Sequence, residues 1–236
     1  MIYVNGDSHS AGAELVKDYC FAADDKKYVS WGSRAHPDAI PHTFGYKIAQ
    51  ALNQPFFMDA ESASSNARIL RTSQKFINQT QDKSKLFVII GWTTPEREEW
   101  QYQDGYIQIT ASGIDSVPES MEEEYREWVV KQTPDEFARK KQIWRERIAQ
   151  FSNELDDQNI KHYFFRTQLE YREYLTGLGY KTVNGGQHFG IEAHSAWFKH
   201  LLPQILARYN TKTDLTQPSK RSIITQVKQE FKGLRN

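Results

Sequence analysis

The feature that most constrains the fold is the uninterrupted apolar run Leu86-Phe87-Val88-Ile89-Ile90. No polar residue interrupts it, so a strand formed by this run would be buried on both faces, as in a parallel sheet covered by helices. Shorter apolar runs predict three further strands, at residues 1–5, 55–58 and 161–166. Apolar side chains recur at helical spacing in other segments, at residues 12–20, 43–53, 66–79 and 191–209. We therefore expect an α/β fold, a three-layer sandwich with a central parallel sheet.

The 236 residues suit one α/β domain with an appendage. We assign residues 1–210 to that domain and expect an insertion at about 98–157. Within the insertion, alternating residues around Asp104-Gly105 indicate a hairpin, and two helices follow, at residues 120–131 and 134–157. The remaining residues, 211–236, form a basic tail with an amphipathic helix. We expect this tail to pack on a partner or a second copy of the chain; the alternative is that it packs back on the domain.

The charge and cysteine content exclude several classes of protein. Acidic and basic residues balance at 30 each, which argues against nucleic-acid or membrane-surface binding. No apolar run approaches the ~20 residues of a membrane span. The first strand starts at Met1, leaving no room for a signal peptide, and Cys20 has no cysteine to pair with, so we expect a cytoplasmic protein. The seven histidines show no zinc-binding spacing, so we expect no metal and no cofactor.

A serine stands directly after the first predicted strand, in Asn5-Gly6-Asp7-Ser8. Gly6 permits a tight turn there. A helix expected from Gly12 to about Tyr19 would point its free N–H groups toward Ser8, where they could stabilise a developing oxyanion. Ser8 is thus a candidate nucleophile. The alternative is that Ser8 simply caps this helix, because serine is a favoured N-cap residue.

Three other polar segments follow apolar ones, at residues 59–69, 91–97 and 184–190. In an open α/β sheet, ligands bind outside the carboxyl ends of the strands, so these segments and Ser8 would line one crevice. His188 in the last segment is the candidate general base. His194, six residues on, is expected to face the helix surface or to support that loop.

Together these segments resemble the SGNH (GDSL-type) hydrolases, in particular divergent members from phages and bacteria. Gly6-Asp7-Ser8 is similar to the family's nucleophile block, and residues 62–69 are similar to the second block. Residues 88–94 occupy the place of the third block, and His188 that of the final block. The resemblance spans roughly residues 1–205. It implies a flavodoxin-like SGNH hydrolase fold, with Ser8 as nucleophile and His188 as base.

The chain departs from the family pattern at three places. The third block reads Gly91-Trp92-Thr93-Thr94 where the family has Gly-x-Asn-Asp, so Asn66 is expected to supply the oxyanion amide instead. Ser64 stands where the second block has glycine, and its backbone N–H could still donate. Gly185 stands where the family has an aspartate, three residues before the histidine. A backbone carbonyl or another acid would then orient His188, or the site would work as a Ser–His dyad, or it would be impaired.

Residues beside these candidates are expected to contact the substrate. We assign this role to Asp7, Ser64, Trp92, Thr93 and Arg97. The Arg97 guanidinium could clamp a carboxylate or phosphate. The alternative is an ion pair with one of the neighbouring glutamates, Glu96, Glu98 or Glu99.

Two functions of different classes fit the sequence. The first is a serine esterase that hydrolyses a small acyl ester, with a carbohydrate O-acetyl group as the substrate that the family resemblance implies. The second is a catalytically impaired protein of the same fold with a binding or structural role, such as that of a phage virion component. A dinucleotide-binding domain is disfavoured because the first turn lacks the Gly-x-Gly-x-x-Gly pattern.

Overall fold

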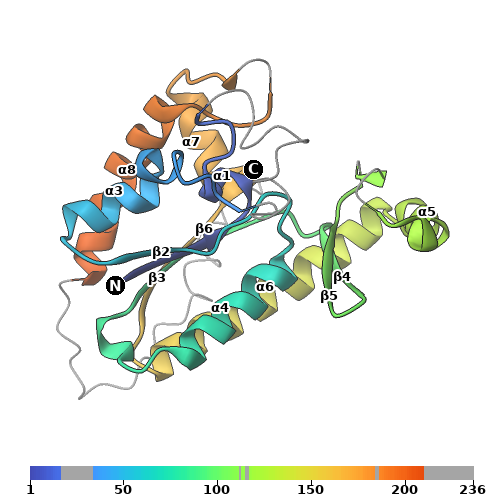
Figure 1. Ribbon diagram of the computed structural model, residues 1–236, viewed down its shortest axis with the longest axis horizontal. Coiled ribbons are helices and arrows are strands. Elements are labelled where there is room, and N and C mark those ends of the chain that lie inside the picture. The colour runs from blue at the N-terminus through green and yellow to red at the C-terminus, as the bar shows by residue number, and fades with distance from the viewer. Residues whose placement is uncertain (17–33, 112, 115–116, 184–185, 210–236) are drawn as a thin grey trace, which may run out of the picture.

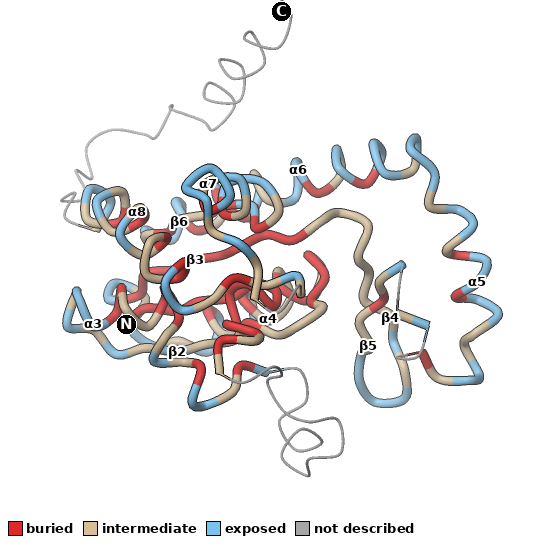
Figure 2. Tube along the Cα trace, turned by 90° about the horizontal axis from the view of Figure 1, so that it is seen from above, coloured by how far each residue is buried: buried red, intermediate tan, exposed pale blue. Residues whose placement is uncertain are grey.

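Four parallel strands form the central sheet of the computed structural model, which describes residues 1–16, 34–111, 113–114, 117–183 and 186–209. The strands are β1 (Ile2–Gly6), β2 (Phe56–Met58), β3 (Phe87–Trp92) and β6 (Lys161–Arg166). Their order in the sheet is β2-β1-β3-β6, and every neighbouring pair is parallel. The longest apolar run thus became a central strand, as its composition predicts, and Figure 2 shows it buried along its length.

Helices cover both faces of the sheet (Figure 1). On one face, α3 (Phe44–Ala51), α7 (Arg172–Gly177) and α8 (Ile191–Tyr209) pack on alternate strand residues such as Val4 and Ile89. On the other face, α4 (Asn66–Gln79) and α6 (Pro134–Asp157) pack on the intervening ones, among them Tyr3, Val88 and Ile90. The expected parallel α/β sheet between two helical layers is confirmed.

Side-chain caps set where the predicted helices begin. Thr43 accepts a hydrogen bond from the Tyr46 N–H at the start of α3, and Ser65 accepts one from the Arg68 N–H at the start of α4. Thr133 caps α6 in the same way, with proline at the first helical position. Each of these caps satisfies a backbone donor that has no partner within its helix.

The helix expected at residues 12–20 is wrong in its position. Helix α1 spans Ser8–Ala11 and ends at Gly12, which adopts the left-handed conformation with φ 74°. A Cβ on Gly12 would also lie 2.8 Å from Thr43 Cγ2, so glycine fits both the turn and the packing. Residues 17–20, including Cys20, lie outside the described residues.

The segment after β6 has no counterpart among the sequence predictions. It begins as one wide π-helical turn, Thr167–Tyr171, and continues directly into α7. Tyr171 is fully buried against Phe165, Phe189 and Trp197. The insertion of such a turn breaks the regular helical spacing of apolar residues, so periodicity alone does not reveal this element.

The insertion forms an arm beside the main core, and α6 runs from this arm into the core (Figures 1 and 2). The hairpin of the arm also contacts α4, where Glu99 pairs with Arg71. The hairpin β4 (Glu98–Tyr102) and β5 (Gly105–Ile109) packs with α5 (Glu122–Val130) around Trp128. The second half of α6, by contrast, contributes Phe151 to the core beside the sheet. Short 3-10 turns complete the described elements, at η1 (Ile40–His42), η2 (Lys83–Lys85) and η4 (Glu119–Met121).

Within the described ranges, no helix is both long and apolar enough to cross a membrane. The tail at residues 211–236, with its expected amphipathic helix and its expected role in assembly, lies outside the described residues.

Close packing at the carboxyl end of β3 makes a first prediction. A Cβ on Gly91 would lie 2.6 Å from Ser10 Oγ and 2.8 Å from Phe165 Cζ. We therefore expect Gly91→Ala to lower the free energy of unfolding by about 1–3 kcal/mol, because the packed core must move. Gly105→Ala is the matched control, since its nearest neighbour atom is 4.0 Å away. Urea titration of both variants measures the difference, and equal stabilities would contradict this account.

Candidate functional site

The candidate site lies where β1 and β3 end side by side. The chain leaves β1 toward β2 on one side of the sheet and returns to β3 on the other, so the strand order reverses between β1 and β3. Such reversal points are where open α/β sheets bind ligands. Ser8 starts α1 at this place, with 6 % of its surface exposed.

The carboxylate of Asp7 ties three strand ends together. It is fully buried; Oδ2 accepts hydrogen bonds from Thr93 Oγ1 and Thr167 Oγ1, both at 2.8 Å. Oδ1 accepts one from the His9 N–H at 3.1 Å, and thereby caps α1. Asp7 itself, rather than Ser8, is the N-cap. The structure therefore places Asp7 beneath the site as a framework residue, not at a substrate-facing position.

Asn66 is bonded to the backbone of Thr93 on both sides of its amide. Its Oδ1 accepts a hydrogen bond from the Thr93 N–H at 2.9 Å, and its Nδ2 donates to the Thr93 carbonyl at 3.2 Å. Asn66, Thr93 and Asp7 thus form one connected polar unit across the ends of β1 and β3. One of the two Nδ2 hydrogens is used in this way, which leaves the second as a donor.

Two residues expected at the site have other surroundings. Ser64 is fully buried, and its backbone N–H already donates to the Glu61 carbonyl at 3.3 Å. Trp92 is 1 % exposed and packs edge-on against Phe151 and Phe164 in the core. The alternation of side chains along β3 turns Trp92 toward the α6 layer and away from the crevice.

Arg97 comes close to the buried carboxylate. Its Nη1 lies 3.7 Å from Asp7 Oδ2. Two of the three glutamates considered as alternative partners pair elsewhere, Glu98 with Lys140 and Glu99 with Arg71. Oε2 of the third, Glu96, is buried without a hydrogen-bond partner in the described part of the chain. Nη1 of Arg97 is itself buried and has no hydrogen-bond partner. Arg97 therefore places a positive charge beside α1.

His188 reaches the same place from the loop before α8. The loop is closed by a hydrogen bond from the Val183 N–H to the His188 carbonyl at 2.9 Å. The His188 ring centroid lies 5.1 Å from that of His9, the residue after Ser8. Nδ1 of His188 lies 3.2 Å from Oε2 of Glu14. No hydrogen bond joins His188 to Ser8 among the described residues, and the observed contact of His188 with α1 is with the ring of His9.

His9 is a site residue that the sequence reasoning missed. Its ring is buried beside Tyr171, and its Nε2 lies 3.3 Å from Gln168 Nε2 on the π-helical turn. Burial lowers the pKa of His9 to about 4, although the Asp7 charge works in the opposite direction. His9 is thus a neutral ring beneath His188. Its position next to Ser8 in the sequence was the only available signal.

His194 does not face the helix surface, as was one expectation. It is 1 % exposed, stacks on Phe44, and its Nδ1 accepts a hydrogen bond from the Phe44 N–H at 3.4 Å. Burial, reinforced by the nearby His9, Lys47 and His188, lowers the pKa of His194 to about 3. Its role is to join α8 to the start of α3 as a neutral acceptor.

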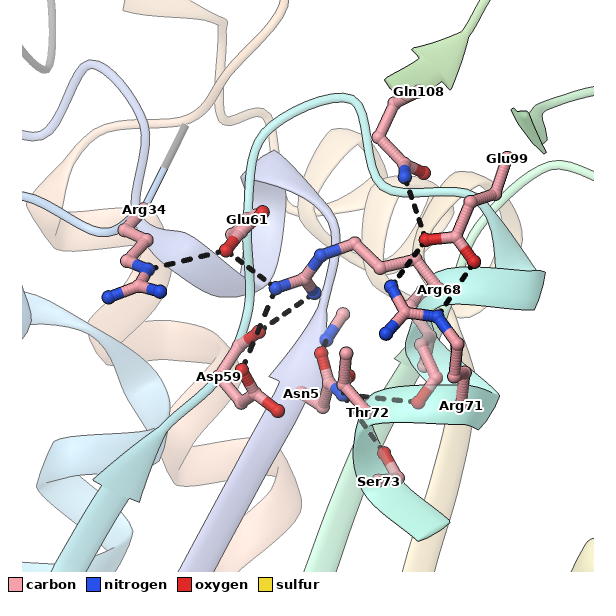
Figure 3. A network of polar contacts seen from close by, with 12 residues as sticks. Asn5, Arg34, Asp59, Glu61, Arg68, Arg71, Thr72, Ser73, Glu99 and Gln108 are labelled. Carbon is pink, nitrogen blue, oxygen red and sulfur yellow. Dashed lines mark hydrogen bonds and ion pairs between the residues drawn. The ribbon is translucent and has the colours of Figure 1, made fainter. Parts of the chain in front are cut away.

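A polar network holds the segment that leads into Asn66 (Figure 3). Arg68 is buried; its Nη2 lies 2.6 Å from Glu61 and 3.6 Å from Asp59. In the same view, Asn5 of β1 donates to Thr72 at 2.8 Å and to Ser73 of α4. These contacts fix the start of α4, and hence the Asn66 amide, relative to β1.

Neither a metal site among the described residues nor a match to a known protein points to a function. The described residues contain no group of three or more histidine, cysteine or acidic side chains that could hold a metal ion. A scan against protein-family models finds no match, and neither curated proteins nor solved structures match the chain. The chemistry must therefore be argued from the residues of the site itself.

The two buried histidines predict acid sensitivity. Because His9 and His194 have lowered pKa values in the folded chain, the unfolded chain binds more protons below pH 6.5. Their contribution to stability is present above that pH and is lost as the pH falls toward 4. For His194 the loss between pH 7 and pH 5 is about 2 kcal/mol. Urea titrations of His194→Gln should show a correspondingly smaller loss than wild type.

The half-buried His42 supplies the control for this experiment. His42→Gln should lose as much stability between pH 7 and pH 5 as wild type does. If His194→Gln also loses as much as wild type, burial of a neutral His194 is not a source of the acid sensitivity.

Proposed function

We propose that the protein is a serine ester hydrolase of the SGNH type, with Ser8 as nucleophile and His188 as general base. The observation that carries this proposal is that His188, from the far end of the chain, lies against the first turn of the helix that Ser8 begins. Nucleophile and base are similarly brought together from distant segments in other serine hydrolases. The family resemblance described above supports the same assignment of roles.

The proposed reaction is acyl transfer through a covalent intermediate. His188 Nε2 takes the Ser8 hydroxyl proton while Oγ bonds to the ester carbonyl carbon and the carbonyl oxygen gains the electron pair. Collapse of this adduct expels the alcohol, which takes the proton from His188. Water then attacks the acyl-serine and gives a proton to His188. Collapse of this second adduct breaks the acyl–Oγ bond, releases the carboxylic acid and returns the proton from His188 to Ser8 Oγ. Contacts between nucleophile and base are often longer before the reacting complex forms, which fits the unbonded Ser8 and His188.

Two donors are suited to the oxyanion. The Ser8 N–H is at the first position of α1, where the helix itself supplies no acceptor. The second is the Asn66 amide hydrogen that the Thr93 carbonyl does not use. Ser64 is a weaker candidate because its N–H already has an acceptor. The Arg97 charge adds a positive potential where the oxyanion forms.

The proposed substrate is a small acyl ester. Ser8 is only 6 % exposed and has small or polar neighbours, which favours a short acyl group such as acetyl. A carbohydrate as the alcohol part rests on the family resemblance alone. The alternative, a binding or structural protein of this fold, is favoured by the absence of a direct Ser8–His188 bond; the following test separates the two.

Ser8→Ala should abolish hydrolysis of p-nitrophenyl acetate, because Ser8 is the proposed nucleophile and begins the helix against which His188 lies. The expected loss is about 10⁴-fold or more in kcat. The matched control is Ser10→Ala in the same helix, whose Oγ is buried without a hydrogen-bond partner and should be dispensable. A fluorophosphonate probe should label wild type and Ser10→Ala but not Ser8→Ala.

Equal and negligible turnover in wild type and Ser8→Ala, with no labelling of folded protein by the probe, would contradict the esterase. The binding or structural role would then stand. Circular dichroism and thermal unfolding of each variant show whether it is folded.

A further inference from the structure

The loop that carries His188 has glycine where the related hydrolases carry their acid, yet a carboxylate still faces the histidine. It belongs to Glu14, from the turn after α1. Its Oε2 lies 3.2 Å from His188 Nδ1, and both atoms are buried. Neither atom has a hydrogen-bond partner among the described residues, so the 3.2 Å contact is an ion-pair distance and not yet an aligned hydrogen bond. The contact therefore brings together one carboxylate and one imidazole that have no competing partners.

The backbone at Glu14 is strained, and this backbone conformation directs the side chain toward His188. Glu14 adopts φ 65°, in the left-handed region that side chains other than glycine, asparagine and aspartate rarely enter. Such conformations are destabilising and persist where the surrounding structure requires them, often at functional sites. The turn that holds Glu14 follows the left-handed Gly12, so the chain reverses after α1 and returns a carboxylate toward the site.

Gly186 makes room for this carboxylate in the histidine loop. A Cβ on Gly186 would lie 2.7 Å from Glu14 Oε2 and 3.2 Å from Oε1. Any larger residue there would displace the carboxylate from His188. Gly186 therefore leaves the space that the Glu14 carboxylate occupies.

We propose that Glu14 is the positioning residue of the catalytic histidine, replacing an acid on the histidine's own loop. In the reacting complex the carboxylate accepts a hydrogen bond from the Nδ1–H of His188, which leaves Nε2 free to take the proton of Ser8. It also stabilises the imidazolium that forms during acyl transfer. This inference rests on the proposed esterase function, and it resolves which group orients His188.

The other ionisable groups around His188 do not supply this role. His9 and His194 are buried, neutral imidazoles, so neither supplies the negative charge that would stabilise a protonated His188. The Asp7 carboxylate is already occupied by Thr93, Thr167 and the His9 N–H. Glu14 is the carboxylate in contact with His188 among the described residues.

The test uses two variants of the full chain, each assayed with p-nitrophenyl acetate. Glu14→Gln keeps the shape of the side chain but removes the charge, so kcat should fall about 10²- to 10⁴-fold with little change in KM. Glu14→Gly also relieves the φ strain, so the variant should lose activity without a lower melting temperature. A merely structural role predicts instead that activity and stability fall together.

Added formate provides the second readout. A groove of about 620 Å³ is lined in part by Glu14, Val183 and Gly190. In Glu14→Gly, a small carboxylate entering from this groove can occupy the space that the Glu14 carboxylate leaves beside His188. Formate should raise the kcat of Glu14→Gly at least about tenfold, since a bound carboxylate recovers part of the lost orientation. Chloride at equal ionic strength should not. Glu192→Gln is the matched control, because Glu192 borders the same groove and has no ion pair with His188.

The outcomes separate the two proposals. Full activity of Glu14→Gln in an active, Ser8-dependent enzyme overturns the role of Glu14 and leaves the esterase standing. A melting temperature of Glu14→Gly that drops by more than about 4 °C together with a loss that formate does not repair also overturns it. A wild type without Ser8-dependent turnover overturns the esterase, and the role of Glu14 with it.

Discussion

The site depends on the hydrogen bonds that the buried carboxylate of Asp7 accepts. A fully desolvated charge is costly unless hydrogen bonds and nearby opposite charge compensate for it. Two threonine hydroxyls and a backbone N–H supply those bonds, and Arg97 supplies the charge. Because these partners come from the ends of β1, β3 and β6, satisfying one carboxylate brings three strand ends into register around Ser8.

The remaining parts of the site are also positioned by pairs of polar groups from distant segments. The Asn66 amide satisfies the backbone of Thr93 after β3. Glu14, held in a strained turn, faces His188 across a loop in which Gly186 leaves it space. Arg68 with its two carboxylates anchors the segment before Asn66. Each contact links segments far apart in the chain, so the site is a product of the folded domain rather than of any one motif.

Much of the fold was predictable because it follows from local pattern. The strand at Lys161–Arg166 and the helices at Asn66–Gln79, Pro134–Asp157 and Ile191–Tyr209 have the expected bounds. Strong apolar periodicity and side-chain caps or prolines mark them. The first helix was misplaced because Gly12 ends it after one turn, and the π-helical turn at Thr167–Tyr171 was missed because it has no regular period. Of the site residues, Ser8, Asn66, Thr93, Arg97 and His188 were named from the sequence, and their roles stay predictions.

The sequence by itself determined the class of fold and the segments that meet at the carboxyl end of the sheet. Hydrophobic period and strand ends are local properties, and parallel strands necessarily bring their carboxyl ends to one edge. Only the tertiary structure decided which groups face one another there. It turned Trp92 into the core, made Asp7 a buried framework residue, and placed Glu14 against His188. These assignments depend on side-chain direction and on contacts between distant segments, which local sequence patterns do not encode.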